Sequence, residues 1–328
     1  MLDRLDPIDR RLLDDFQRDL PLVPRPFAAM GEVLGVDEAE VLQRLDILHA
    51  RGMVSRVGAT VRPNTAGAST LAAMAVPSDR IEEIAEIVGA EPGVNHSYLR
   101  EDAWNLWFVA TAPDATALEA ALGRIGSRTG LRVLDLRLVR PFNIDLGFRL
   151  APGARQEMSE SRAVNTDVLE QSDRPILQAL TAGLPLTLRP FRAVAQSLSR
   201  NECDIIARIA ALSDAGLLTR VGVIVRHRAI GWSANAMVVW NLPEDRIDAA
   251  GPALARQRGV TLCYRRLTVP GIWDYPLYSM IHARSRSEAL SILAEAAALP
   301  ELAGAAHRVL FSTRCFKQTG ALLKAEAA

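Results

Sequence analysis

The sequence predicts an α+β protein made of two tandem copies of a winged helix-turn-helix domain followed by a ferredoxin-like βαββαβ domain. Three observations predict this fold class: an internal repeat, a helical pattern that opens each copy, and a strand-rich pattern that closes each copy. The chain has 328 residues, of which 49% are hydrophobic and 23% charged. This length and composition fit several ordinary globular domains and exclude a chain that is disordered throughout.

The internal repeat sets Leu5 against Leu169 and continues without a gap to Arg62 and Arg226. The matching segments are LPL at 20–22 and 184–186, RPF at 25–27 and 189–191, and RVG at 56–58 and 220–222. Later landmarks persist after a small shift in register: Tyr98, Arg100, Arg140 and Phe142 correspond to Tyr264, Arg266, Arg314 and Phe316. The period is too long for a solenoid, so the chain reads as two fused copies, an internal pseudo-dimer.

The opening part of each copy has helical spacing. In copy one, apolar residues predict a helix within 5–19 and a second over 27–34, and Asp37 can cap a third. Residues 53–62 are strand-like. Three short helices and a strand are typical of a winged helix-turn-helix, and residues 169–226 repeat the pattern.

The closing part of each copy has the order β-α-β-β-α-β, which is that of a ferredoxin-like domain. In copy one the elements are expected at 71–76, 81–87, 93–100, 105–111, 115–125 and 131–139. In copy two they are expected at 236–240, 246–256, 260–266, 277–283, 288–297 and 307–312. We therefore assign residues 1–63 and 169–228 to winged helix-turn-helix domains, 68–150 and 233–320 to ferredoxin-like ligand or catalytic domains, and 151–168 to a linker. The two ferredoxin-like parts are expected to pair face to face.

Several classes of protein are disfavoured by composition. The N-terminus is charged, and no apolar run is long enough for a membrane span, so we expect a cytoplasmic protein without membrane contact. Cys203, Cys263 and Cys315 are too few and too scattered for a disulfide framework or a structural zinc site, so no metal site is expected.

Sequence-specific DNA binding is also disfavoured. The 38 basic and 38 acidic residues balance, whereas charge-driven DNA binding usually needs a basic excess. At the recognition-helix position of copy one, Asp37, Glu38 and Glu40 would meet a polyanion, and no Lys or Arg precedes Arg44. Acidic residues at a helix N-terminus also complement the helix dipole, so they need no function of their own.

Chemistry-bearing residues gather on the central strand pair of each ferredoxin-like part. In copy one, His96, Tyr98 and Arg100 alternate to one face of a strand, in a row of about 13 Å. In copy two, Tyr264 and Arg266 hold the matching row, and His282 joins it from the neighbouring strand. The same strands and their connections carry planar and cationic side chains: Trp104, Trp107, Trp273, Tyr275 and Arg265.

This composition suits a large, flat, polyanionic ligand, with arginines as carboxylate clamps and histidines for proton transfer or an axial bond to iron. Aromatic side chains on sheets commonly form core, so a purely structural role stays open for each residue taken alone. His227, flanked by Arg226 and Arg228, could border the ligand or act as a hydrogen-bonded hinge.

A winged helix followed by βαββαβ resembles the AsnC/Lrp-like regulator family over nearly the whole of each half. The pairing of GVNHSYLR (93–100) and WNLWF (104–108) with GVTLCYRR (259–266) and WDYPLYSMIH (273–282) is more specific. It resembles the siroheme decarboxylases of heme d1 biosynthesis, with the first half similar to the D-type subunit and the second half to the L-type subunit. The segment 226–245 also looks like the L-type subunit. Ser97 and Pro276 stand where Asn is common in the family.

The resemblance implies a carboxy-lyase that removes the two pyrrole-ring acetate carboxylates of siroheme, giving didecarboxysiroheme and CO₂. It implies His96, His282, Tyr98 and Tyr264 as catalytic residues, and Arg100, Arg265 and Arg266 as substrate-orienting residues with the aromatic residues and His227 beside them. No cofactor is implied beyond the iron of the substrate. The implied partners are siroheme, its products, related subunits of the same pathway and a possible higher oligomer. The alternative is an AsnC/Lrp-type transcription regulator that senses heme or an amino acid.

Overall fold

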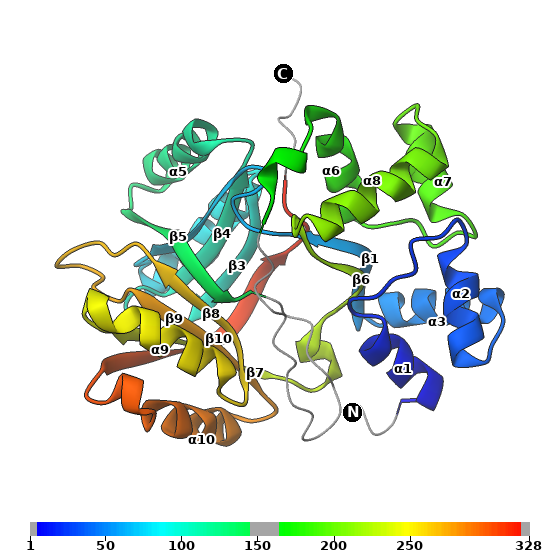
Figure 1. The fold of residues 1–328 in the computed structure, drawn as a ribbon. Coiled ribbons are helices and arrows are strands. Elements are labelled where there is room, and N and C mark those ends of the chain that lie inside the picture. Colours follow the sequence, from blue (N-terminus) through cyan, green and yellow to red (C-terminus); the bar gives the residue numbers. More distant parts are fainter. Residues whose placement is uncertain (1–4, 145–163, 323–328) are drawn as a thin grey trace. The chain divides into compact units, whose positions relative to one another are not determined.

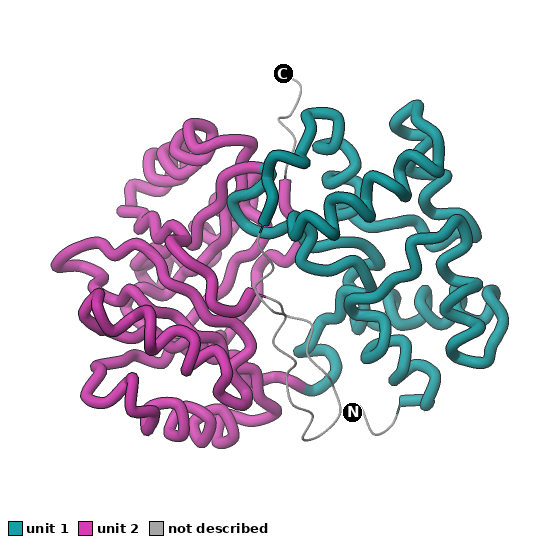
Figure 2. The backbone as a smooth tube through the Cα atoms, in the orientation of Figure 1, with its two compact units in different colours: residues 1–66, 147–155, 162–231 teal, residues 67–146, 156–161, 232–328 magenta. Residues whose placement is uncertain are grey.

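The computed structural model describes residues 5–144 and 164–322. Most of the predicted linker, residues 151–163, lies outside this range, as do residues 1–4 and 145–150 of the predicted domains. The chain forms two compact units, and each unit draws on both copies of the repeat (Figure 2). The helical parts, through residues 66 and 231, make up unit 1, and the strand-rich parts, from residues 67 and 232, make up unit 2.

Unit 1 contains the predicted helices of both copies (Figure 1). Copy one supplies α1 (Pro7–Asp15), α2 (Pro26–Leu34), α3 (Glu38–Ala50) and β1 (Val54–Val61). Copy two supplies η3 (Thr166–Val168), η4 (Gln171–Asp173), α6 (Arg174–Ala182), α7 (Pro190–Ser197), α8 (Glu202–Asp214), β6 (Leu218–Val225) and η5 (His227–Ile230). As the sequence predicts, Asp37 caps α3 by accepting a 2.7 Å hydrogen bond from the Glu40 backbone N–H. Gly35 ends α2 with φ at 76°, a conformation that glycine adopts without a steric cost.

One strand from each copy joins the two halves of unit 1. β1 and β6 pair antiparallel, with Gly58 opposite Gly222. The helix packing crosses over, because α6 of copy two packs on β1 and α1 of copy one contacts β6. The backbone bonds are symmetric: Leu184 N–H donates to Val57 O at 2.7 Å, and the matching Leu20 N–H donates to Val221 O at 3.0 Å. Neither copy therefore completes this unit alone.

Unit 2 contains a closed eight-stranded barrel in the order β10-β3-β4-β2-β5-β8-β9-β7. Copy one supplies β2 (Ala68–Met74), η2 (Ser78–Arg80), α4 (Ile81–Ala90), β3 (Val94–Arg100), β4 (Leu106–Ala112), α5 (Ala115–Thr129) and β5 (Val133–Asn143). Copy two supplies β7 (Ala234–Asn241), α9 (Glu244–Arg256), β8 (Val260–Arg266), β9 (Leu277–Ala283), α10 (Arg286–Ala297), η6 (Pro300–Leu302) and β10 (Ala306–Gln318). The element order in each copy is the predicted one, and the bounds differ by a few residues except at β5 and β10.

The last strand of each copy closes the barrel by serving both copies. β5 pairs with β2 over Val133–Arg137 and with β8 of the other copy over Leu138–Asn143. β10 pairs with β7 and then, from Ser312, with β3. The expectation of two sheets that merely face one another was therefore incomplete. The sheets are hydrogen-bonded at both edges, because each final strand is longer than the alternation of apolar residues indicates.

These extensions also place one phenylalanine of each copy in the apolar core of the other copy. Phe142 packs against the cluster beneath α9 and α10, and Phe316 packs against the cluster beneath α4 and α5. An arginine beside each phenylalanine pairs with a carboxylate on the other copy, Arg140 with Asp248 at 2.7 Å and Arg314 with Glu82. A third apolar cluster, which includes Trp107, Trp273 and Tyr278, fills the inside of the barrel.

Candidate active site

The predicted row of copy one lies on the inner face of the barrel. The rings of His96 and Tyr98 are stacked with centroids 6.3 Å apart, and the Arg100 guanidinium lies 5.5 Å from the Tyr98 ring centroid. Tyr98 is opposite Trp107 in the β3–β4 register, and Trp107 belongs to the inner cluster. The two-residue alternation in the sequence therefore correctly places His96, Tyr98 and Arg100 on one face of β3, which is the inner face of the barrel.

His96 is held by the residue that precedes it. Its Nδ1 lies 2.6 Å from Asn95 Oδ1, and the amide of Asn95 donates to Thr111 Oγ1 at 3.2 Å. Because Oδ1 can only accept, the His96 proton lies on Nδ1. Nε2 of this half-buried ring is then the atom that takes or gives a proton. Asn95 was not anticipated from the sequence, because a bulge in β3 between Val94 and His96 changes the alternation there.

The predicted row of copy two is also internal. The Arg266 guanidinium lies 5.0 Å from the Tyr264 ring centroid and 5.9 Å from that of Tyr278. Burial raises the pKa of the Tyr264 and Tyr278 phenols, so both stay protonated at neutral pH. His282 lies on β9. The alternate residues Leu277, Ser279 and Ile281 of this strand face the helices, so His282 lies on the other face, which is internal.

His282 lies in a chain of polar side chains. Its Nδ1 is 2.7 Å from Thr261 Oγ1 and its Nε2 is 2.9 Å from Asn235 Nδ2. Asn235 Oδ1 lies 3.5 Å from Nη1 of Arg100, so the chain connects a residue of copy one with a histidine of copy two. His282 is 7% exposed and Arg100 is 6% exposed. Asn235 and Thr261 were not anticipated, because their role depends on strand register.

The two inner arginines are anchored alike. Arg100 Nη1 donates to Leu310 O at 3.1 Å, and Arg266 Nη1 donates to Leu136 O at 2.9 Å. Leu310 and Leu136 lie on the final strands β10 and β5 of the opposite copies. Burial is the main effect on Arg266 and lowers its pKa. Within the described ranges, no carboxylate pairs with Arg266, and its Nε has no hydrogen-bond partner.

The aromatic candidates pack in the apolar cluster inside the barrel. Trp107 and Trp273 are fully buried, with ring centroids 5.2 Å apart, and Trp273 Nε1 donates to the Tyr278 hydroxyl at 2.7 Å. Trp104 and Tyr275 are partly buried against the same cluster. Arg308, which the sequence did not suggest, lies 5.5 Å from the Tyr275 ring centroid. The planar residues therefore form part of the barrel core, and Trp273 and Tyr275 also contact Arg308.

One predicted residue does not join this group, and another belongs to the other unit. Arg265 lies on the opposite side of β8 from Arg266 and pairs with Glu244 of α9, because successive side chains on a strand alternate. Counting it with Arg266 as a substrate clamp overlooked this alternation. His227 begins η5 in unit 1, and its predicted substrate contact stays a prediction.

Burial, and next the charge of Arg100, lower the pKa of His282 from 6.5 to about 4. A histidine with a depressed pKa costs stability as the pH falls, because the unfolded chain takes up a proton that the folded chain does not. The loss begins near pH 6.5 and is complete below about pH 4.

We expect the His282→Gln variant to lose less stability than the wild type on acidification. The difference between the two proteins should change by about 2 kcal/mol between pH 7 and pH 5. Urea unfolding at both pH values measures it. A difference that does not change with pH would contradict a depressed pKa.

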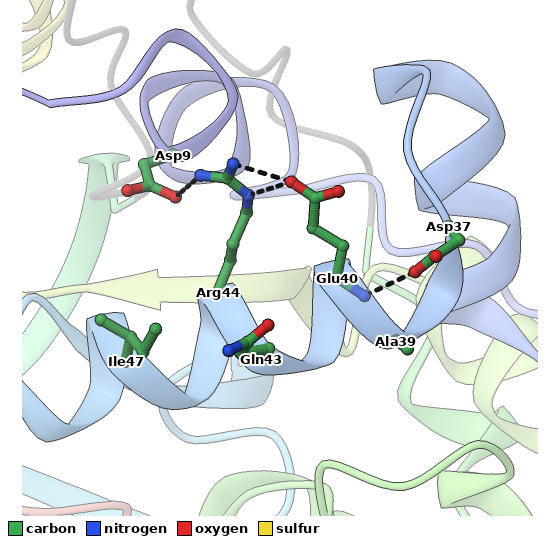
Figure 3. A pocket seen from close by; sticks show the side chains of 7 residues that line it. All are labelled: Asp9, Asp37, Ala39, Glu40, Gln43, Arg44 and Ile47. Carbon is green, nitrogen blue, oxygen red and sulfur yellow. Dashed lines mark hydrogen bonds and ion pairs between the residues drawn. The ribbon is translucent and has the colours of Figure 1, made fainter.

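The recognition-helix position is locally acidic in the folded protein. Figure 3 shows that Arg44 extends between Asp9 and Glu40, with Nη1 2.9 Å from Asp9 Oδ1 and Nη2 2.7 Å from Glu40 Oε1. Asp37 is occupied as the N-cap. We expected the Glu38 carboxylate to face outward, towards DNA. It is instead buried and accepts a hydrogen bond from Arg25. The first basic residue of α3 is thus neutralised within the protein.

Two further features bear on function. Among the residues that the structure describes, no group of three or more His, Cys, Asp or Glu side chains could hold a metal ion. No helix in the same ranges is long and apolar enough to cross a membrane.

Family profiles match both kinds of unit. The AsnC-like ligand binding domain matches residues 66–142 and 229–317, and the siroheme decarboxylase NirDL-like HTH domain matches residues 9–54 and 173–218. The siroheme decarboxylase NirDL subunit of Paracoccus denitrificans is 62% identical over 324 residues, which is 99% of both chains. The NirD subunit of Stutzerimonas stutzeri is 48% identical over 44% of this chain and 96% of its own, and the NirL subunit is 35% identical over 48% and 92%.

A solved structure is similar over nearly the whole chain. The crystal structure of the siroheme decarboxylase NirDL in complex with an iron-uroporphyrin III analogue is 28% identical, with a TM-score of 0.68. It covers 96% of this chain and 93% of its own. These likenesses extend through the helical parts, the barrel and both copies of the repeat, so the chain belongs to the siroheme decarboxylase NirDL family.

Proposed function

We propose that this chain is a carboxy-lyase that removes the two pyrrole-ring acetate carboxylates of siroheme and releases CO₂ and didecarboxysiroheme. The observation that carries the proposal is the full-length likeness to siroheme decarboxylases at 62% identity. The complex of a related protein with an iron-uroporphyrin III analogue supports a carboxylated tetrapyrrole as the ligand. The only metal in the reaction is the iron that siroheme brings, and no further cofactor is proposed.

The reaction needs a way to stabilise charge and a proton. When the bond between the acetate methylene and its carboxylate breaks, CO₂ leaves and the electron pair stays on the methylene carbon, where the conjugated macrocycle delocalises it. One proton then converts each methylene into a methyl group. The protein must hold the remaining carboxylates, keep the reacting acetate in apolar surroundings and supply the proton.

The inner residues suit these tasks unequally. His96 is half-buried with Nδ1–H fixed on Asn95, so we assign it as the proton donor, a role that it performs from Nε2 when the ring is in its charged imidazolium form. His282 is buried and neutral, so we assign it to orientation and charge control rather than to resting proton donation. Arg100 and Arg266 hold substrate carboxylates, and Tyr98 and Tyr264 flank them as neutral phenols. Trp104, Trp107, Trp273 and Tyr275 exclude water from the arginines.

The finer architecture and partners complete the proposal. Each half is a winged helix-turn-helix domain followed by a ferredoxin-like domain, and their strands join as an internal pseudo-dimer in the cytoplasm. Related subunits such as NirD and NirL make partner subunits a reasonable requirement for full conversion. We propose no sequence-specific DNA binding, because the first turn of α3 is acidic and the first arginine of the helix, Arg44, is paired with Asp9 and Glu40.

The proposal is tested by anaerobic incubation of the purified protein with siroheme and mass analysis of the extracted tetrapyrrole. Loss of one or two CO₂ supports it. Unchanged siroheme, with and without added related subunits, would overturn it, and a salt-dependent shift of promoter DNA would favour the regulator.

Replacing Arg266 with methionine should weaken siroheme binding by about tenfold or more, because a charge-assisted carboxylate contact is lost while the aliphatic stem is kept. The neighbouring Arg265→Met is the matched control. Arg265 faces α9 and pairs with Glu244, so its loss should leave the Kd for siroheme nearly unchanged. Titration of the siroheme absorption band gives Kd for both variants, and equal effects would show that Arg266 is not a specific clamp.

A further inference from the structure

The C-terminal segment at residues 319–322 reaches the histidine site of the opposite copy. It follows β10, which pairs with β3 as far as Gln318, opposite His96. Beyond the strand, the Thr319 backbone N–H donates to Asn95 O at 2.8 Å, and the Thr319 hydroxyl donates to the same oxygen at 3.3 Å. The main chain of Asn95 is therefore held from copy two at the bulge in β3.

Thr111 on β4 holds the side chain of Asn95. Its Oγ1 accepts from Nδ2 of Asn95 and from the Leu322 backbone N–H, each at 3.2 Å, and its own proton is directed to Gly93 O at 3.4 Å. With Nδ2 turned to this hydroxyl, Oδ1 of Asn95 faces Nδ1 of His96 at 2.6 Å. The C-terminal segment therefore holds Asn95 twice, at its carbonyl directly and at its amide through Thr111.

Copy two has a polar pair at the same two positions. Thr261 is the second residue of β8, as Asn95 is of β3, and His282 is the sixth residue of β9, as Thr111 is of β4. Thr261 Oγ1 lies 2.7 Å from Nδ1 of His282. The opposite copy reaches this pair as well, because Asn143 at the end of β5 donates from Nδ2 to Thr261 O at 2.9 Å. In both halves a polar pair connects a histidine with the end of the other copy's last strand, which apolar packing alone would not require.

We propose that Thr111 is a positioning residue through which the C-terminal segment of copy two, residues 319–322, orients His96 in copy one. Together they hold Asn95 with its amide oxygen towards Nδ1, so the imidazole proton stays on that nitrogen and Nε2 exchanges protons. Asn95 and Thr111 are both buried, so bulk water does not replace a bond that one of them loses. The consequence for catalysis rests on the proposed function, in which His96 is the proton donor.

The test follows the ¹⁵N resonances of His96 in the full-length protein, identified by their loss in His96→Gln. In the neutral ring of the wild type, we expect the Nδ1–H tautomer. Thr111→Val removes the hydroxyl at nearly constant size, so a substantial Nε2–H population should appear, and Thr111→Ser should restore the wild-type tautomer. Thr129→Val is the matched control, because the Thr129 hydroxyl is also buried but donates to Ile125 O within α5.

Two substitutions of Leu322 test the C-terminal segment itself. Leu322→Pro removes the backbone N–H that donates to Thr111, whereas Leu322→Ala keeps it. We expect the proline variant to show the same change of His96 tautomer as Thr111→Val. The alanine variant should keep the wild-type tautomer.

Turnover of siroheme gives the second readout. Thr111→Val and Leu322→Pro should each lower kcat about tenfold with little change in KM, because the arginines that hold the substrate are untouched. Thr111→Ser should recover most of the rate, and Thr129→Val should leave both constants unchanged.

A wild-type tautomer in both Thr111→Val and Leu322→Pro would overturn the proposal, whether or not kcat falls, because the effect would then not pass through His96. If the wild type does not decarboxylate siroheme but the His96 tautomer responds as described, the proposed function fails while the positioning by Thr111 stands.

Discussion

Replacing His96 with alanine is expected to lower siroheme turnover by about 10²- to 10⁴-fold, the range that general acid catalysis usually contributes. The ring is half-buried on the inner face of β3, stacked on Tyr98, and its Nδ1 is fixed by Asn95 at 2.6 Å. Nε2 is thus the proton-transferring atom. The loss should be mainly in kcat, since the arginines that hold the substrate remain.

Two comparisons make the His96 result specific. His307→Ala removes an exposed histidine whose ring lies tilted against Trp240, with centroids 4.8 Å apart, and it should leave turnover unchanged. Asn95→Leu keeps the His96 ring but removes its hydrogen bond, so the pH profile of kcat should change. Rates from single-turnover mass analysis measure all three, and a near-normal rate in His96→Ala would assign proton delivery to another group.

Replacing Gly58 with valine is expected to destabilise unit 1 by roughly 3 kcal/mol or more. A Cβ on Gly58 would lie 2.2 Å from Leu180 O, and a Cβ on the paired Gly222 would lie 2.4 Å from the backbone oxygens of Phe16 and Gln17. These oxygens belong to α6 and to the segment after α1, so they cannot move aside without breaking the β1–β6 seam.

The measurement is the free energy of unfolding from urea denaturation, followed by Tm. Gly123→Ala in α5 is the opposite control, because a Cβ there meets no atom within 4 Å. It should stabilise the protein by about 0.5–1 kcal/mol through the lower backbone entropy of the unfolded chain. A Gly58→Val protein as stable as the wild type would refute the close approach of α6.

Local elements were predictable because short-range physics decides them. Asp37 as a helix cap and the inward face of Tyr98 and Arg100 follow from capping chemistry and from the two-residue period of a strand. The internal repeat itself indicated that the two copies would pair with one another. The bounds of the helices and most strands therefore agree with the sequence to within a few residues.

The register between distant strands was not predictable, and the candidate site depends on it. Asn235 has no feature in the sequence that connects it to His282, because only the β7–β9 pairing sets them side by side. The lengths of β5 and β10 were underestimated for the same reason, since their final residues are polar or aromatic and gain their partners from the other copy. The repeated Arg-x-Phe at 140–142 and 314–316 was the available signal for these extensions.

The crossing of β5 and β10 between the copies has a consequence for how the two halves of the chain can diverge in sequence. Two identical halves would build two identical clusters, so a change useful at one would be imposed on the other. Here the partners of a single cluster, Arg100 and His282, are encoded in different halves and meet in fixed one-to-one proportion. Fusion therefore allows the two halves to differ in sequence. A substitution in one half at this shared cluster must also be compatible with the residues that the other half contributes.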